Sequence, residues 1–287
     1  MTIASILLLL QGGDGDSAVA ETAARVATTF DARIDGLIVR PDPREAVRLA
    51  VDGMSPAMIE GVMAATRSDS EVRVGRARAA FEHACAEHGL RLGGSSPTAH
   101  WAEETGNDAD FIAYRGRLAD LLVIGRPGQG SADETYAAIE AALFETGRPL
   151  LLAGPTPHRS LEGTAVIAWN GSTETTRAVS AALPFLARAE KVVALEIDPR
   201  PATGGAGRPR AEALCAHLAC HDIDASAHTT QAEGRPIGEA LLAEATGLGA
   251  NLMVMGAYSH SRLRELVLGG VTRRVLAGAE IPVLMAH

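Results

Sequence analysis

The sequence predicts an α/β protein built from two tandem copies of one Rossmann-like, doubly wound domain, each with a parallel five-stranded sheet. Three observations support this fold class. Short apolar runs alternate with amphipathic segments, one stretch of sequence recurs in the second half, and a Pro/Gly-rich linker at residues 153–159 separates the copies. Strands that alternate with helices are typical of right-handed crossovers and a parallel sheet.

The repeat is clearest between residues 119–125, Ala-Asp-Leu-Leu-Val-Ile-Gly, and residues 250–256, Ala-Asn-Leu-Met-Val-Met-Gly, at an offset of 131 (256 − 125). Cys85 and Cys215 match at a similar offset of 130 (215 − 85). Repeated sequence at a fixed offset indicates a repeated structural unit.

The offset at the start of the repeat indicates that the first copy contains an insertion. Residues 34–39 parallel residues 192–197 at an offset of 158 (197 − 39), which is 28 more than the 130 found later (158 − 130). We therefore assign the two domains to residues 1–153 and 163–287, and the insertion to about residues 40–70 of the first. The insertion is expected to contain its own apolar helix, with Met58, Ile59, Val62 and Met63.

Each copy is expected to read β-α-β-α-β-α-β-α-β. In the first, the pattern predicts strands near 5–10, 34–39, 98–102, 121–124 and 150–152, and helices near 17–29, 71–88, 109–118 and 134–145. In the second, it predicts strands near 165–168, 192–197, 225–229, 252–255 and 283–285, and helices near 173–187, 209–220, 236–246 and 272–278.

Composition limits the classes of function. With 47% hydrophobic and 21% charged residues, the chain can bury a substantial core. A net charge of −9 argues against non-specific binding to nucleic acid or to an anionic membrane. Three cysteines, an odd number, fit reduced thiols better than a disulfide framework. We expect a cytoplasmic protein with no nucleic-acid or membrane partner.

The glycine-rich stretch in residues 251–272 holds the main candidate site. An apolar run ends at Gly256, a polar loop follows, and Gly269-Gly270-Val271-Thr272 begins a helix. Glycines at that point leave backbone N–H groups open to a close anion, and the helix N-terminus adds positive partial charge. A phosphate group is the ligand that this arrangement favours.

These residues resemble the C-terminal half of a universal stress protein domain. That family's signature is Gly, two residues, Gly, nine residues, Gly, then Ser or Thr. Gly256 and Gly269 match it, Gly270 stands where Ser or Thr is usual, and Thr272 supplies a hydroxyl two residues later. Ser259 replaces the second glycine of the signature.

The resemblance implies the strand order 3-2-1-4-5 and packing of the two domains as an internal pseudo-dimer through their last strands. Two chains would associate further as a homodimer. It also implies a stress-related regulatory protein that binds ATP or AMP, with Mg²⁺ if the ligand is ATP. Trp169 would stack on the base or fill the pocket. The expected nucleotide-binding residues are Asn170, Met255, Gly256, Ser259, Gly269, Gly270, Val271 and Thr272.

The first copy is expected to be a degenerate site. Gly125-Arg126-Pro127-Gly128 keeps the Gly-x-x-Gly, but Asp133 and Glu134 place negative charge near the following helix start, where they would repel phosphate. Residues 13–18, Gly-Asp-Gly-Asp-Ser-Ala, fit a dinucleotide-binding pattern. We interpret them as a turn, because Asp14 and Asp16 would face a pyrophosphate.

Other chemistry is less well supported by the residues. His217 and His221 are four residues apart on a helix, but no third metal ligand or catalytic glutamate is evident, so we expect no metal site. A catalytic triad is not identifiable, and at most slow ATP hydrolysis is expected. The alternative functions are an adaptor that binds a protein partner through a blocked or repurposed pocket and, third, a flavin or nicotinamide oxidoreductase.

Overall fold

The computed structural model describes residues 2–44, 55–93, 98–127, 132–157, 160–197, 210–257 and 270–287. The chain divides into two compact units, which are Ile3–Thr146 and Gly147–His287, the latter together with Met1–Thr2. Each unit contains a mostly parallel sheet with helices on both faces, which confirms the predicted α/β class.

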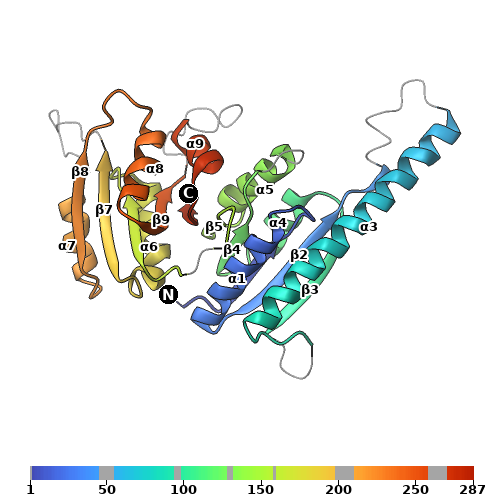
Figure 1. The fold of residues 1–287 in the computed structure, drawn as a ribbon, viewed down its shortest axis with the longest axis horizontal. Helices are drawn as coiled ribbons and strands as arrows, with labels where there is room; N and C mark the ends of the chain where they lie inside the picture. The colour runs from blue at the N-terminus through green and yellow to red at the C-terminus, as the bar shows by residue number, and fades with distance from the viewer. Residues whose placement is uncertain are drawn as a thin grey trace. The chain divides into compact units, whose positions relative to one another are not determined.

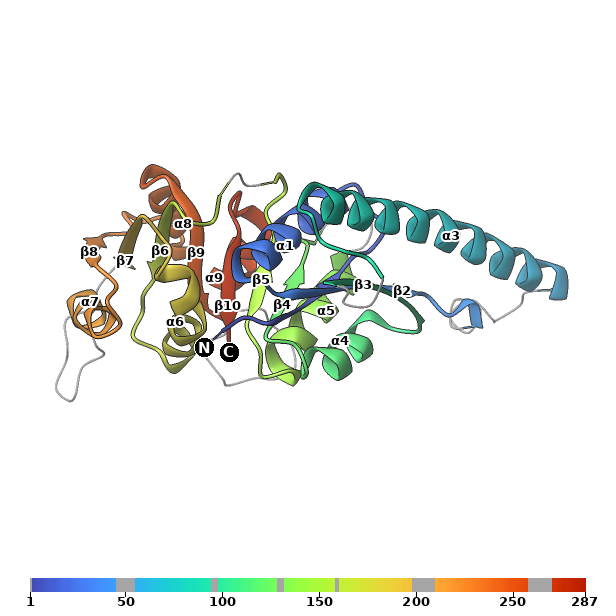
Figure 2. The same ribbon diagram turned by 90° about the horizontal axis from the view of Figure 1, so that it is seen from below.

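In the unit Ile3–Thr146, four parallel strands lie in the order β3-β2-β1-β4. They are β1 (Ser5–Leu9), β2 (Arg33–Arg40), β3 (Ala99–Thr105) and β4 (Leu121–Ile124). One face of this sheet is covered by α1 (Asp16–Phe30) and α3 (Pro56–Glu87), and the other by α4 (Asp108–Gly116) and α5 (Ala132–Glu145) (Figures 1 and 2). Because both faces are covered, β1 and β4 are continuous apolar runs rather than alternating ones.

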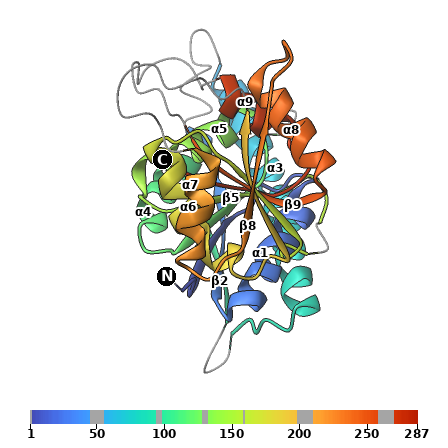
Figure 3. The same cartoon turned by 90° about the vertical axis from the view of Figure 1, so that its left-hand side faces the viewer.

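Among the described residues of the unit Gly147–His287, six strands lie in the order β5-β10-β9-β6-β7-β8. They are β5 (Leu150–Leu152), β6 (Thr164–Ala168), β7 (Lys191–Ile197), β8 (Ala225–Thr230), β9 (Ala250–Gly256) and β10 (Val283–Ala286). The helices α6 (Thr173–Leu186) and α7 (Ala211–Ala219) lie on one face, and α8 (Ile237–Gly247) and α9 (Gly270–Gly278) on the other (Figure 3).

The second copy therefore has the predicted order, since β8-β7-β6-β9-β10 is 3-2-1-4-5. The first copy has 3-2-1-4 within its own unit, and its fifth strand, β5, belongs to the other unit. There β5 pairs antiparallel with β10, and Leu151 lies opposite Leu284. The two last strands of the repeat are thus paired, as the resemblance implies.

The long helix α3 differs from the prediction. The sequence predicts one helix within the insertion and a second helix that begins near residue 71. The structure has one continuous helix of 32 residues. Ser55 caps its N-terminus by accepting a hydrogen bond from the Met58 backbone N–H at 3.4 Å, and Pro56 occupies the first turn. Met63, Thr66 and Ser70 continue the helical spacing of one face through the region between the two predicted helices.

Within the described residues, we find no helix that combines the length and the apolar character needed to cross a membrane.

Candidate functional site

The candidate site lies at the carboxyl ends of β6 and β9, the two central strands of the unit Gly147–His287. After β6 the backbone N–H of Trp169 still donates to the Leu195 carbonyl at 2.8 Å. The chain then turns through Gly171, whose φ of +66° lies in the left-handed region. Parallel sheets bind ligands at this edge, and strand β6 lies at the switch point of the topology.

Asn170 shapes the turn that follows β6. Its side-chain carbonyl oxygen, Oδ1, accepts a hydrogen bond from the Ser172 backbone N–H at 3.0 Å and another from the Thr175 hydroxyl at 2.7 Å. The Ser172 hydroxyl in turn caps α6 by accepting from the Thr175 backbone N–H at 3.2 Å. Ser172 and Thr175 are not among the predicted site residues, although a Ser before a helix is a known capping signal.

Gly256 lets the first turn of α6 pass directly over the end of β9. A Cβ atom added at Gly256 would lie 2.7 Å from the carbonyl carbon of Glu174 and 2.8 Å from the Thr175 hydroxyl oxygen. The close approach of this helix backbone therefore explains why position 256 is a glycine. Its neighbour Met255 is 4% exposed and belongs to the core of the sheet.

The N-terminus of α6 already carries a negative charge. Burial raises the pKa of the Glu174 carboxyl, but hydrogen bonds from its own backbone N–H and from the hydroxyls of Ser172 and Thr173 outweigh this, and His287 adds attraction, so the net pKa is lowered. The carboxylate is ionised at neutral pH and occupies the positive end of the helix. A second anion is therefore disfavoured at this helix terminus.

The N-terminus of α9 has the opposite character. Among the described helices of this unit, α6, α7 and α8 each have an acidic residue in the first turn, and α9 has none. Its first residue, Gly270, is exposed, and a Cβ added there would meet nothing within 4 Å. Among the described residues, none requires a glycine at this position.

The rest of the first turn of α9 is anchored to the protein. Thr272 is 4% exposed, and Val271 is partly exposed. The backbone of α9 approaches α8 closely at Gly238, where an added Cβ would lie 2.9 Å from the Arg274 Cβ. Arg274 also forms an ion pair with Glu239. The start of α9 is thus held by its neighbour while its first residue remains open to solvent.

Two predicted site residues, Ser259 and Gly269, lie outside the described part of the chain. Trp169 is described and is 7% exposed, so its indole packs in the interior and does not form an open stacking surface. The structure therefore brings Asn170, Gly256 and Met255 to one edge of the sheet, and it places Gly270, Val271 and Thr272 at the start of α9.

The equivalent edge in the unit Ile3–Thr146 is built differently. The backbone N–H of Leu10 donates to Leu37 at 2.9 Å, as Trp169 does to Leu195 in the other copy. The next turn contains Gly12, with φ of +75°, and here α3 crosses over the backbone. A Cβ at Gly12 would lie 2.6 Å from the Arg73 carbonyl oxygen.

A polar cluster, defined by Gln11, Asp16, Arg73, Asp108 and Thr135, fills this edge. Asp16 accepts hydrogen bonds from two backbone N–H groups, that of Gln11 to Oδ1 at 3.3 Å and that of Gly12 to Oδ2 at 2.8 Å. Arg73 Nε donates to the Gln11 backbone carbonyl at 2.8 Å. The Gln11 side chain donates through Nε2 to Asp108 Oδ2 at 2.9 Å and accepts at Oε1 from Thr135 Oγ1 at 2.7 Å. No sequence pattern indicates this cluster, because its members are up to 124 positions apart.

The two carboxyl groups of the polar cluster have raised pKa values, chiefly because burial penalises their charged forms. Arg73 opposes this increase at both, and Glu134 adds to it at Asp108. Asp133 and Glu134 lie in the first turn of α5, as the sequence predicts. This concentration of carboxyl groups does not suit a phosphate ligand.

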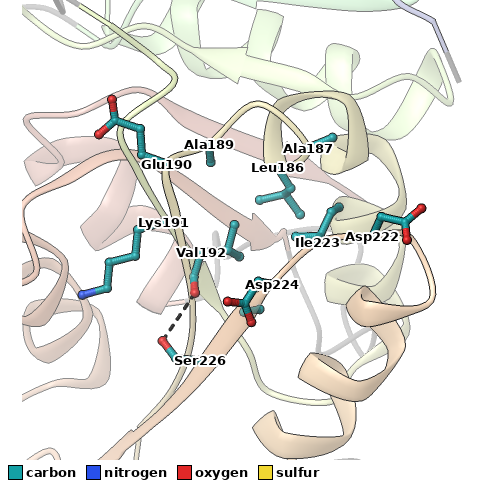
Figure 4. Close-up of a pocket in the computed structure, with 11 residues that line it drawn as sticks. Leu186, Ala187, Ala189, Glu190, Lys191, Val192, Asp222, Ile223, Asp224 and Ser226 are labelled. Atoms are coloured by element: carbon teal, nitrogen blue, oxygen red, sulfur yellow. Dashed lines mark hydrogen bonds between the residues drawn. The ribbon is translucent and has the colours of Figure 1, made fainter.

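A separate cavity of about 350 Å³ lies in the unit Gly147–His287 where β7 and β8 begin, at the opposite end of the strands from the candidate site (Figure 4). Its lining includes the apolar residues Leu186, Val192 and Ile223 and the charged residues Glu190, Lys191, Asp222 and Asp224. It lies away from Asn170 and the start of α9, at the end of the strands where parallel sheets rarely bind ligands.

The remaining candidates show no organised chemistry. The rings of His217 and His221 are 5.0 Å apart in an edge-to-face arrangement, and no cluster of three or more potential metal ligands occurs among the described residues. Cys85 is buried, and burial raises the pKa of its thiol to about 11. Cys215 is partly buried with a raised pKa for the same reason, which fits a packing role better than a nucleophilic one.

Residues 163–287 match the family model of the universal stress protein family. The C-terminal region of the chain is a universal stress protein domain. A search of curated proteins finds no match for this chain.

Solved universal stress proteins share the tandem fold over nearly the whole chain. A universal stress protein from Archaeoglobus fulgidus is 14% identical, with a TM-score of 0.66, and the match covers 98% of this chain and 95% of that one. A putative universal stress protein from Pseudomonas aeruginosa is 15% identical, with a TM-score of 0.60 and coverage of 99% and 93%. A functionally unknown protein from the same species is 12% identical, with a TM-score of 0.57 and coverage of 99% and 92%. At these identities, the likeness concerns the fold.

Proposed function

We propose that the universal stress protein domain of this chain binds an adenine nucleotide, ATP or AMP, with the phosphates at the N-terminus of α9. The observation that carries the proposal is the contrast between two glycines. The fold itself explains Gly256, whereas Gly270 has open space where a side chain would stand and lies at a helix terminus free of acidic residues. A ligand that approaches the backbone closely is a physical reason for glycine there.

The base and ribose would lie toward the edge formed by Asn170 and Gly256. Asn170 Oδ1 already accepts two hydrogen bonds within its own turn, so the proposed role of this residue is to stabilise the conformation of the loop. Contacts to the sugar would come from the outer side of that turn. If the ligand is ATP, Mg²⁺ would be held mainly by the phosphates, as is usual for this ion. We expect at most slow hydrolysis.

The proposed role is regulatory, in the response to stress and in the cytoplasm, with the nucleotide as the signal. The first copy is proposed to have lost its site, because the polar cluster fills the equivalent edge and carries two buried carboxyl groups. The chain would then bind one nucleotide.

A thermal-shift experiment tests this function. ATP with Mg²⁺, or AMP, should raise the melting temperature of the full chain, since a ligand at about 100 times its Kd stabilises the folded state by roughly 2.7 kcal/mol. Gly270→Asp should abolish the shift, because it adds a negative charge and a side chain at the start of α9. Gly270→Ala fills the same space without the charge and should weaken binding less.

A chain that melts at the same temperature with and without nucleotide would refute the proposal. It would favour the adaptor alternative, in which the pocket serves a protein partner.

A further inference from the structure

One face of the helix α3, here called the stripe, can be followed at helical spacing from Ile59 to Cys85, and only the later part of it is buried. Every buried residue of this helix lies at Ser70 or beyond. These buried residues are Ser70, Val74, Ala77, Phe81, Ala84 and Cys85. They recur with the spacing of one helix face, and α3 packs there against α1 and β2.

The same face continues toward the N-terminus of α3. Counting back from Ser70 in steps of three and four reaches Thr66, Met63, Val62 and Ile59, which all remain partly exposed. Both views of the chain show this part of α3 running out beyond the strands of its own unit (Figures 1 and 2). Three of these four residues are apolar, and an apolar helix face is normally covered.

We propose that a second copy of this chain covers this stripe, with residues 56–69 of the two copies packed as antiparallel helices around a two-fold axis. Such an interface is self-complementary, because each copy contributes the same patch. With the axis near residues 62 and 63, Val62 packs against Met63 of the partner subunit, and Ile59 lies opposite Thr66 of the partner subunit.

Charge complementarity supports this occupant and this direction. Glu60 and Arg67 are seven residues apart, so both lie on the same flank of the stripe, about two helical turns from each other. In an antiparallel two-fold pair each flank faces itself. With the axis near residues 62 and 63, Glu60 lies level with residue 65 of the partner subunit, about 3 Å along the helix from the level of Arg67 of the partner subunit. The side chains of Glu60 and Arg67 can span this offset, so the ion pair forms twice. A parallel pair would set this flank against the one that carries Asp69, and Glu60 would then gain no cation.

The proposed interface is short. Residues 56–69 span roughly 21 Å of helix, and a two-helix contact of that length buries less than the standard interface of about 1,600 Å². We therefore expect a reversible dimer with a Kd in the micromolar range.

Sedimentation velocity of the full chain over a concentration series tests the proposal. The wild-type chain should pass from monomer to dimer. Met63→Glu should keep it monomeric, because it buries two carboxylates at the axis. Val72→Glu is the control: Val72 is 54% exposed and lies on the far side of the helix from Ser70 and Val74, outside residues 56–69, so a glutamate there should leave the dimer intact. Far-UV circular dichroism should show unchanged helix content in both variants.

Charge exchange tests the proposed ion pair between the two copies of α3. Glu60→Arg and Arg67→Glu should each weaken the dimer several-fold. An equimolar mixture of these two variants should associate again, because each supplies the charges that the other needs. A wild-type chain that stays monomeric would overturn the proposal. So would a dimer that survives Met63→Glu, or a mixture that associates no better than its components.

Discussion

Gly256 and Glu174 approach so closely that a Cβ atom on the glycine would lie 2.7 Å from the glutamate's carbonyl carbon. This contact sets the first turn of α6 over the end of β9. The same turn holds the Ser172 cap and the Asn170 hydrogen bonds, so the shape of the candidate site depends on a residue that has no side chain.

Gly256→Ala should destabilise the protein. The added methyl group meets helix backbone, which cannot move aside as a flexible side chain would, and overpacking of this kind costs about 1–3 kcal/mol. Urea unfolding should show this loss in the free energy of unfolding. Gly270→Ala is the control, since its Cβ has open space, and it should be neutral or stabilise α9 by up to about 1 kcal/mol. Equal effects of the two substitutions would contradict the contact.

Arg73→Ala should destabilise the unit Ile3–Thr146. Arg73 donates to the Gln11 carbonyl and offsets the charges of Asp16 and Asp108, so its loss leaves buried carboxyl groups without their nearby cation. We expect a loss of about 2–4 kcal/mol. Denaturant unfolding measures it, with the exposed Arg76 changed to Ala for comparison. A loss no larger than that of Arg76→Ala would argue against the polar cluster as a stabilising element.

Asp108→Asn should change how stability depends on pH. Burial and the nearby Glu134 raise the Asp108 pKa, so the folded state binds this proton more tightly than the unfolded state does. The wild-type carboxyl therefore opposes folding increasingly as pH rises from its ordinary pKa of about 4 through its higher folded value. The Asn side chain can still accept the hydrogen bond from Gln11 and does not ionise.

The free energy of unfolding of Asp108→Asn minus that of the wild type should thus be more positive at pH 7 than near pH 4. Urea titrations of both proteins at the two pH values measure this difference. A difference that becomes more negative as the pH rises would mean that the folded pKa is lowered.

Much of the fold is predictable from the sequence because the repeat and the apolar runs carry it. The match between residues 119–125 and 250–256 locates β4 and β9, and the predicted helices and strands lie within a few residues of the observed ones. The prediction is wrong at α3. There, polar Ser68, Asp69 and Ser70 lie between the two predicted helices, but the stripe from Ile59 to Cys85 keeps its helical period and the helix is continuous.

The candidate site is less predictable, for a physical reason. A glycine in a sequence shows that a side chain is absent, but it does not show why. The structure is needed to show that Gly256 makes room for a helix while Gly270 faces open space. The polar cluster around Gln11 joins residues from four separate parts of the chain, and such contacts leave no local pattern.

Native mass spectrometry of the full chain saturated with ATP and Mg²⁺ counts the nucleotides bound to each chain. We expect one nucleotide per chain, and none for Gly270→Asp. Two nucleotides per chain would show that the first copy also binds. A wild-type chain that carries none would show that the start of α9 is not a nucleotide site.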